Sequence, residues 1–194
     1  MQKILTRKLI LENSSFFIEE IIKGKVFIYP TDTLQGLGTN GLDTVGITRI
    51  MDIKKRTKKA FLVIAPTLEW IFENCFIAND GIEKTLKEKL PGPYSFILEL
   101  KNRQAVNPLA INHGSTIGVR LPNNWFAKII EQSGVPFLST SINFSGEASA
   151  KSLAEVPKEI IDKVDYVVWD EVASSGRGSV IIDVTTGVSK IIRN

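Results

Sequence analysis

A cluster of hydroxyl and amide side chains follows a short apolar segment in the C-terminal half of the sequence. The apolar residues Val135–Leu138 are predicted to form a short buried strand. The next seven residues contain Ser139, Thr140, Ser141, Asn143 and Ser145. Side chains two residues apart lie on one face of an extended chain, so Ser139, Ser141 and Asn143 are expected to project together. Uncharged donors and acceptors at the end of a core strand are typical of ligand sites in open α/β sheets. The alternative is a turn in which these hydroxyls bond only to their own backbone.

Cationic side chains elsewhere in the chain favour the ligand-binding interpretation. Residues 54–59 carry five cations in six positions. Lys54 and Arg56 share one face if the chain is extended there, and point about 200° apart if it is helical. Arg120 ends an apolar strand, so we expect its charge at the rim of the sheet, and Thr31–Thr33 directly follow an earlier strand. Such groups bind carboxylate or phosphate and indicate catalysis by positioning and charge neutralisation.

Other chemistries find little support in the sequence. The glycines Gly36, Gly38 and Gly41 match the spacing of a dinucleotide-binding fingerprint, but a polar loop separates them from the preceding strand. Lysines also occupy the region where that fingerprint needs an acidic residue, so we predict a structural turn instead. His113 is the single histidine, in an expected surface turn, and Cys75 is the single cysteine. Neither a Ser-His-Asp triad, a zinc site nor an internal disulfide is therefore predicted.

The expected elements place these polar groups at strand ends. Strands are predicted at 26–29, 61–65, 94–100, 116–121, 135–138, 165–169, 179–184 and 188–192. Helices are predicted from Asn13 or Ser14 to Gly24, after Asp43, after Pro66, at 80–90, at 125–131 and near 153–163. Strands and helices intermingle throughout, so the sequence predicts an α/β fold with a mixed sheet between helix layers.

Length and composition are those of one domain. The chain has 194 residues, 43% of them hydrophobic, and we expect a single domain over 8–194, with residues 1–7 as an N-terminal extension or edge strand. No apolar run approaches the roughly 20 residues of a membrane span, and the N-terminal residues do not resemble a secretory signal. A cytoplasmic location is expected.

Six segments resemble, in the same order, the YrdC/Sua5 family of threonylcarbamoyl-AMP synthases. They are Tyr29–Thr33 with Gly36–Gly38, Lys54-x-Arg56, Pro91–Leu98, Thr116–Pro122, Ser139–Gly146 and Ser179–Asp183. The resemblance implies a three-layer YrdC-like fold, in which helices flank a twisted mixed sheet with a concave basic pocket. It also implies that L-threonine, bicarbonate and ATP are converted to L-threonylcarbamoyladenylate and pyrophosphate, for the threonylcarbamoyladenosine modification of tRNA.

The resemblance implies a role for each matching residue. Four residues match a catalytic tetrad that holds ATP and the adenylate: Lys54, Arg56, Ser141 and Asn143. Further ATP contacts are implied for Thr116, Ser149 and Arg193. Contacts with L-threonine are implied for Thr33, Arg120, Ser139 and Ser179, with Arg120 facing the carboxylate. Mg²⁺ is expected to arrive with ATP, without a tight metal site in the protein.

Partners follow from the same resemblance. In length the chain resembles the short bacterial form of the family, which works with separate t6A transfer-complex proteins, and tRNA or double-stranded RNA is a further expected partner. No membrane partner is expected. The chain departs from the family pattern at a few positions, which affects the details of the pocket but leaves the tetrad whole. These positions are Gln35, where an aromatic residue is common, Thr57, Ala60, Ala65 and Val180.

Two other functions compete with the synthase. The first is an RNA-binding module of the same fold that grips double-stranded RNA or tRNA through the cations of 54–59 and makes no adenylate. The second is a maturation domain like those of hydrogenase-processing proteins, which form a carbamoyl-adenylate from carbamoyl phosphate. The absence of the zinc-binding and acylphosphatase regions that accompany such domains weakens this second alternative.

Overall fold

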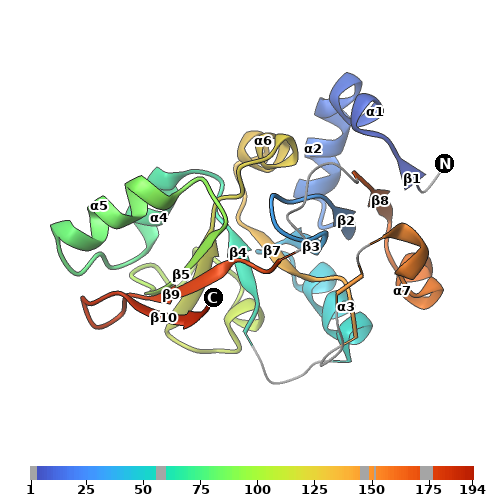
Figure 1. Ribbon diagram of the computed structural model, residues 1–194. Helices are drawn as coiled ribbons and strands as arrows, with labels where there is room; N and C mark the ends of the chain where they lie inside the picture. Colours follow the sequence, from blue (N-terminus) through green and yellow to red (C-terminus); the bar gives the residue numbers. More distant parts are fainter. Residues whose placement is uncertain (1–3, 56–59, 145–148, 151, 171–176) are drawn as a thin grey trace.

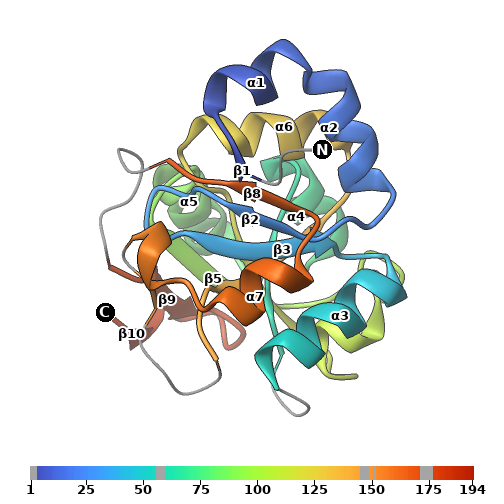
Figure 2. The same ribbon diagram turned by 90° about the vertical axis from the view of Figure 1, so that its right-hand side faces the viewer.

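A ten-stranded mixed sheet forms the centre of the computed structural model, which describes residues 4–55, 60–144, 149–150, 152–170 and 177–194. The strand order is β1-β8-β2-β3-β7-β4-β6-β5-β9-β10. Helices lie above and below the twisted sheet, as Figures 1 and 2 show. The predicted α/β architecture with a mixed sheet between helices is therefore confirmed.

The strands are short and pair in both directions. They are β1 (Ile4–Leu5), β2 (Phe27–Tyr29), β3 (Gly36–Asn40), β4 (Leu62–Ile64), β5 (Tyr94–Glu99), β6 (Thr116–Arg120), β7 (Phe137–Ser141), β8 (Tyr166–Val168), β9 (Val180–Asp183) and β10 (Lys190–Arg193). In the centre, β7 runs antiparallel to both β3 and β4, whereas β4 is parallel to β6. The hydroxyl-bearing strand β7 thus lies in the middle of the sheet.

The helices begin mostly where the sequence supplies a cap. They are α1 (Arg7–Glu12), α2 (Ser14–Ile22), α3 (Thr44–Lys54), α4 (Leu68–Asn74), α5 (Asp80–Lys89), α6 (Trp125–Ser133) and α7 (Lys158–Lys163), with 3₁₀ turns η1 (Pro108–Ile111) and η2 (Leu153–Glu155). Side-chain oxygens of Asp43, Thr67, Asn79 and Asn124 accept from backbone N–H groups in the first turns of α3, α4, α5 and α6. These caps replace hydrogen bonds that the first turn of a helix lacks.

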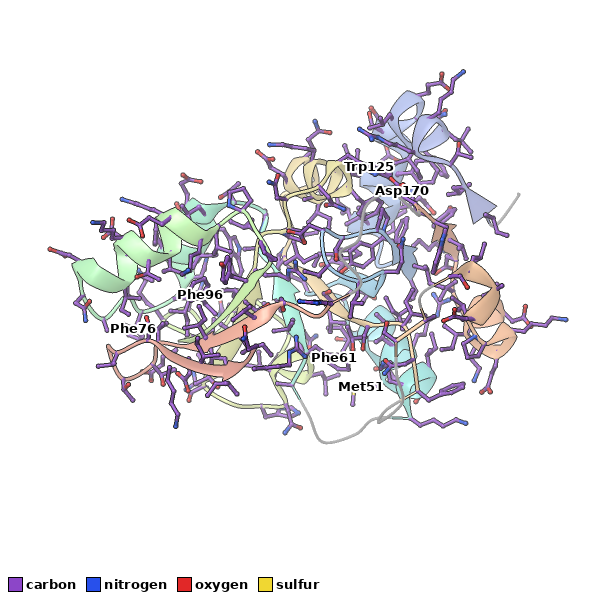
Figure 3. The ribbon with its side chains drawn as sticks, viewed as in Figure 1. Met51, Phe61, Phe76, Phe96, Trp125 and Asp170 are labelled. Atoms are coloured by element: carbon purple, nitrogen blue, oxygen red, sulfur yellow. The ribbon has the colours of Figure 1, made fainter. Side chains whose placement is uncertain are left out.

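Three hydrophobic clusters attach the helices to the sheet. Helices α2 and α6 pack on β2, β7 and β8 through residues such as Phe17, Phe126 and Phe137. Helices α3 and α7 pack against β2, β3 and β7, and Figure 2 shows them across the sheet from α1, α2 and α6. Helices α4 and α5 cover β5, β6 and β9, with Phe96 at the centre of that cluster. Figure 3 labels Phe96 in this half of the molecule.

The glycine-rich segment is a strand and not a turn, so that prediction was wrong. Gly36 and Gly38 lie in β3, whose neighbours on the two sides are β2 and β7. A Cβ atom added to Gly36 would lie 2.6 Å from the ring of Tyr29, and one added to Gly38 would lie 2.3 Å from the ring of Phe137. Glycine is needed here because two buried aromatic rings occupy the space above the strand.

One helix and the bounds of one strand also differ from the sequence-based expectation. The helix α1 was not predicted, and it precedes α2 with only Asn13 between them. The strand predicted at 135–138 instead runs from Phe137 to Ser141, because the backbone of β7 continues to pair with β3 up to the Gly36–Ser141 position. The hydroxyls of Ser139 and Ser141 therefore belong to the strand itself and do not form a turn after it.

Candidate functional site

A cavity of about 1220 Å³ lies against the middle of the sheet. It is lined by the β2–β3 connection and by residues of β4, β5, β6, β7 and β9. Nine of the eleven residues singled out from the sequence line it: Thr33, Thr116, Arg120, Ser139, Ser141, Asn143, Ser149, Ser179 and Arg193. Lys54 is bonded to two of these residues, whereas Arg56 lies outside the described part of the chain. Phe61, which Figure 3 labels, forms part of the apolar wall.

Lys54 is a buried cation at one side of this cavity. It is the last residue of α3, is only 2% exposed, and its Nζ donates to Ser141 O at 2.7 Å and to Asn143 O at 2.6 Å. It also donates to Asn143 Oδ1, which in turn accepts from Ser141 Oγ at 2.7 Å. These three acceptors are neutral oxygens, so they hold the ammonium group by hydrogen bonds.

The end of α3 explains how the chain leaves Lys54. Lys55 has a φ of 49°, in the left-handed region, and its backbone N–H donates to Asp52 O and Met51 O as a helix C-cap. The ammonium group of Lys55 lies 4.7 Å from the centre of the Phe144 ring, a cation–π contact between α3 and the segment after β7. Lys54 is therefore helical and Lys55 is the C-cap of the helix. Whether Lys54 and Arg56 share a face is not decided, because Arg56 lies outside the described residues.

Arg120 is a second buried cation, at the end of β6. Its guanidinium donates to Asp32 Oδ1 at 2.5 Å and to Thr33 Oγ1 at 2.8 Å, and the residue is 5% exposed. The charge was expected at the rim of the sheet. It lies at the end of β6 and is buried there against the β2–β3 connection, where it forms an ion pair with Asp32. Burial lowers the pKa of Arg120, the carboxylate of Asp32 opposes that shift, and the positive charge of Arg193 adds to it.

The β2–β3 connection is itself ordered by hydrogen bonds. Thr31 Oγ1 accepts from the backbone N–H groups of Thr33 and Leu34 and donates to Leu34 O. Asp32 Oδ2 accepts from the backbone N–H of Asn123, which follows β6. These bonds hold Thr33 and Asp32 against Arg120, so the guanidinium has a fixed orientation.

Two serine hydroxyls line the cavity with their partners already in place. Tyr29 donates to Ser139 Oγ at 2.6 Å, and burial raises the pKa of Tyr29 to about 12, so the phenol stays protonated at neutral pH. Because Ser139 accepts this bond, its own proton remains available to a ligand. Ser179 Oγ lies 2.7 Å from Ser95 Oγ, and Arg193 donates to Ser179 O at 2.9 Å through Nη2.

The remaining predicted residues also take their places in the cavity wall. Thr116 begins β6, and Ser149 lies after β7 with a buried Oγ that has no hydrogen-bond partner in the described structure. Among the departures from the family pattern, Gln35, Ala60 and Val180 line the cavity. Ala65 lies in the core beside α4 and donates its N–H to Arg120 O at 3.0 Å, whereas Thr57 is outside the described residues.

Sequence reasoning did not identify every contributor. Tyr29, Ser95 and Arg177 were not singled out, and Asp32 was noted without its partner Arg120. Ser95 is a polar residue inside an otherwise apolar strand, which is the signal that would have drawn attention to it. His113 lies in an exposed turn, as predicted from its neighbours.

Within the described residues, no group of three or more His, Cys, Asp or Glu side chains is arranged to hold a metal ion. None of the described helices has the length and apolar character needed to span a lipid bilayer.

A basic cavity with hydroxyl and amide donors, at the centre of a mixed sheet, defines a class of small-molecule binding protein. Residues 19–194 match the Sua5/YciO/YrdC family model, which is described as telomere recombination, and the chain therefore belongs to this family. The expected resemblance to the YrdC/Sua5 family is thus confirmed.

Curated relatives and solved structures agree with this assignment. A putative threonylcarbamoyl-AMP synthase of Methanocaldococcus jannaschii is 34% identical over 162 residues, which cover 84% of this chain and 74% of the relative. The threonylcarbamoyl-AMP synthase of Vibrio vulnificus strain YJ016 is 25% identical, with 91% of this chain and 96% of the relative covered. The structure of P. abyssi Sua5 complexed with L-threonine has a TM-score of 0.80 and 25% identity, over 93% of this chain and 53% of that one.

Proposed function

We propose that this protein is a threonylcarbamoyl-AMP synthase, which forms L-threonylcarbamoyladenylate and pyrophosphate from L-threonine, bicarbonate and ATP. The observation that carries the proposal is the gathering of Lys54, Ser141, Asn143 and Arg120 around one cavity, from distant parts of the chain. The names of the two curated relatives support it. They do not favour the alternative of an RNA-binding module without synthase activity.

The amino acid binds at the Arg120 side of the cavity. A guanidinium binds a carboxylate well because its N–H groups match the two oxygens. In Arg120, one terminal nitrogen bonds to Asp32 and the other to Thr33, while Nε has no partner among the described residues. Nε and the remaining terminal N–H groups therefore receive the carboxylate of L-threonine. The hydroxyls of Thr33, Ser139 and Ser179 recognise the rest of the molecule.

ATP binds at the Lys54 side. The tetrad of Lys54, Arg56, Ser141 and Asn143 holds the phosphates, and Thr116, Ser149 and Arg193 add nucleotide contacts. Nζ of Lys54 already donates to three protein oxygens, so it acts by its charge and by holding Ser141 and Asn143 in position. Negative charge moves onto the departing pyrophosphate during transfer of the adenylyl group, and cations fixed beforehand stabilise it without reorganisation.

Mg²⁺ enters this site with ATP. The described residues that line the cavity include hydroxyls, amides and cations but no aspartate or glutamate, so these residues fit a metal that the triphosphate carries and not one held by the protein. Magnesium retains several waters and needs few protein oxygens in such sites. When bound, the metal would neutralise phosphate charge, and Ser141 and Asn143 would offer it oxygen donors from the tetrad.

The product has a place in tRNA modification. We propose that separate t6A transfer-complex proteins take the threonylcarbamoyl group from the adenylate to adenosine in tRNA, and that this occurs in the cytoplasm. Direct contact with tRNA or double-stranded RNA is part of the same proposal, through the cations of residues 54–59 other than Lys54, which is buried.

The test is direct detection of the product. Purified protein is incubated with ATP, L-threonine and bicarbonate, and the adenylate and pyrophosphate are measured by mass spectrometry and a pyrophosphate assay. Both are expected, in equal amounts, and both depend on each of the three substrates. RNA binding without any adenylate would contradict the synthase and support the RNA-binding module.

A further inference from the structure

Gln35 is a buried amide in the cavity wall, just before β3. It is 4% exposed, and its Nε2 donates to Asp170 O at 2.7 Å. Asp170 is held in turn by Trp125, whose Nε1 donates to Asp170 Oδ2 at 2.8 Å, and Figure 3 labels these two residues beside each other. A backbone carbonyl accepts only from an N–H group, so this contact fixes which end of the Gln35 amide is the nitrogen.

The other end of the amide has no partner. Within the described residues, four buried side-chain atoms lack a hydrogen bond: Gln35 Oε1, Arg120 Nε, Ser149 Oγ and Trp169 Nε1. The first three belong to residues that line the cavity. Buried polar groups without a partner are rare in folded proteins, because they lose hydrogen bonds to water and gain none in return. Their concentration around one cavity indicates that a polar ligand supplies the missing partners.

We propose that Gln35 contacts the substrate and determines specificity, with its Oε1 accepting an N–H from the α-nitrogen of the amino acid. The inference rests on the synthase function proposed above. Gln35 is two residues from Thr33, so their Cα atoms are at most about 7 Å apart, and Thr33 bonds to Arg120. The α-nitrogen of an amino acid is only one carbon away from its carboxylate. A carboxylate on Arg120 therefore brings the α-nitrogen into the region of Gln35.

A neutral amide oxygen suits this nitrogen throughout the reaction. The α-nitrogen is an ammonium group when the amino acid enters, and it keeps one N–H after a carbamate has formed on it. A carbonyl oxygen accepts from both forms, and it carries no charge that would repel the carboxylate of the amino acid or the phosphates of ATP.

The experiment compares two ligands and two proteins. L-Threonine and 3-hydroxybutanoate share the carboxylate and the hydroxyl, but the second ligand has no α-nitrogen. Their affinities for the wild-type protein and for Gln35→Leu are measured by calorimetry, with the α,β-methylene analogue of ATP present so that no adenylate forms. We expect Gln35→Leu to weaken L-threonine roughly 10- to 100-fold, as for loss of a hydrogen bond to a charged group. The affinity for 3-hydroxybutanoate is expected to stay unchanged.

A matched control separates contact from folding. Thr39 lies in β3, the strand that follows Gln35, and it does not line the cavity. It donates to Gly24 O at 2.9 Å, so Thr39→Val removes a buried side chain–backbone hydrogen bond close to Gln35 in the sequence. This variant is expected to leave the affinity ratio of the two ligands unchanged. Equal weakening of both ligands by Gln35→Leu, or no weakening of either, would overturn the inference. Failure of the wild-type protein to form adenylate would instead count against the synthase itself, and failure to bind L-threonine would overturn both.

Discussion

The two buried cations beside the cavity are held by different groups. Lys54 donates to three neutral oxygens of Ser141 and Asn143, which fix the position of its ammonium group. Arg120 is paired with the carboxylate of Asp32, so that pair is close to neutral. Fixed cations stabilise the charge that develops on a triphosphate, whereas a single carboxylate is recognised by N–H groups in a fixed orientation. The comparison is therefore between an ammonium group held by hydrogen bonds and a guanidinium held by an ion pair.

Removal of Mg²⁺ is expected to have the largest effect on adenylate formation. It should affect the use of ATP on the Lys54 side of the cavity but not the binding of L-threonine on the Arg120 side. With a chelator in excess, adenylate formation is expected to stop, because the described residues of the cavity wall include no aspartate or glutamate that could hold a metal without ATP. Stabilisation of the protein by L-threonine alone should persist, as measured by thermal unfolding. Full activity with the chelator would contradict the idea that the metal arrives on the triphosphate.

The second-largest effect on adenylate formation is expected for Arg56→Ala. The side chain belongs to the tetrad implied by the family resemblance, and loss of one fixed charge contact typically costs ~10²–10³ in rate. Adenylate formation should fall by that amount, while the unfolding temperature stays near that of the wild type. Lys58→Ala is the matched control, since it removes a cation of the same run outside the tetrad. Near-full activity of Arg56→Ala would show that the phosphates bind elsewhere.

Arg120→Ala tests the other side. Stabilisation by L-threonine should be lost, whereas much of the stabilisation by ATP should remain, because the two cations serve different substrates. Thermal unfolding with each ligand measures both effects. The substitution also leaves Asp32 without its cation, so the double variant Asp32→Asn with Arg120→Ala is needed as a control. Equal loss of the two ligand effects in the double variant would show that the sides are not separate.

Selectivity among amino acids should give smaller shifts. L-Threonine should raise the unfolding temperature, more so with ATP, while L-serine should have an intermediate effect, since one methyl group is worth about 1–3 kcal/mol. L-Valine should do little, because the hydroxyls of Thr33, Ser139 and Ser179 would lose their partner in the ligand. Equal shifts with L-threonine and L-valine would refute the assignment of these hydroxyls.

The smallest expected effect is that of the salt concentration on the affinities for ATP and L-threonine, which should differ between the two ligands. Raising the salt concentration from about 0.05 to about 0.5 M shortens the range of electrostatic interactions severalfold. ATP affinity should weaken markedly, whereas L-threonine affinity should change little, because Asp32 already neutralises Arg120. Calorimetry of each ligand alone at both concentrations measures this. A salt dependence of L-threonine as strong as that of ATP would contradict the near neutrality of the Asp32–Arg120 pair.

The sequence by itself determined much of the fold and of the cavity wall. Local signals suffice for elements such as α3, whose cap Asp43 and apolar spacing are both read from nearby residues. The alternation of Ser139, Ser141 and Asn143 likewise follows from strand geometry, and all three residues line the cavity. The central strand β3 and the helix α1 were not predicted. The strand β3 is rich in glycine and forms by pairing with β2 and β7, and the buried Ile10 of α1 belongs to a hydrophobic cluster that includes residues from distant parts of the chain.

Only the tertiary structure decided which groups meet. Asp32 and Arg120 are 88 positions apart, and no spacing rule relates them, yet the β2–β3 connection and the end of β6 bring them into contact. The glycines of β3 are required by the fold, because the rings of Tyr29 and Phe137 occupy the space that a Cβ atom at Gly36 or Gly38 would fill. The tertiary structure also decided the burial of Lys54. In the sequence Lys54 is one of a run of cations, whereas in the fold its ammonium group is buried and donates to three neutral oxygens. Local patterns specify elements, whereas the charge balance of a site depends on which distant residues share its volume.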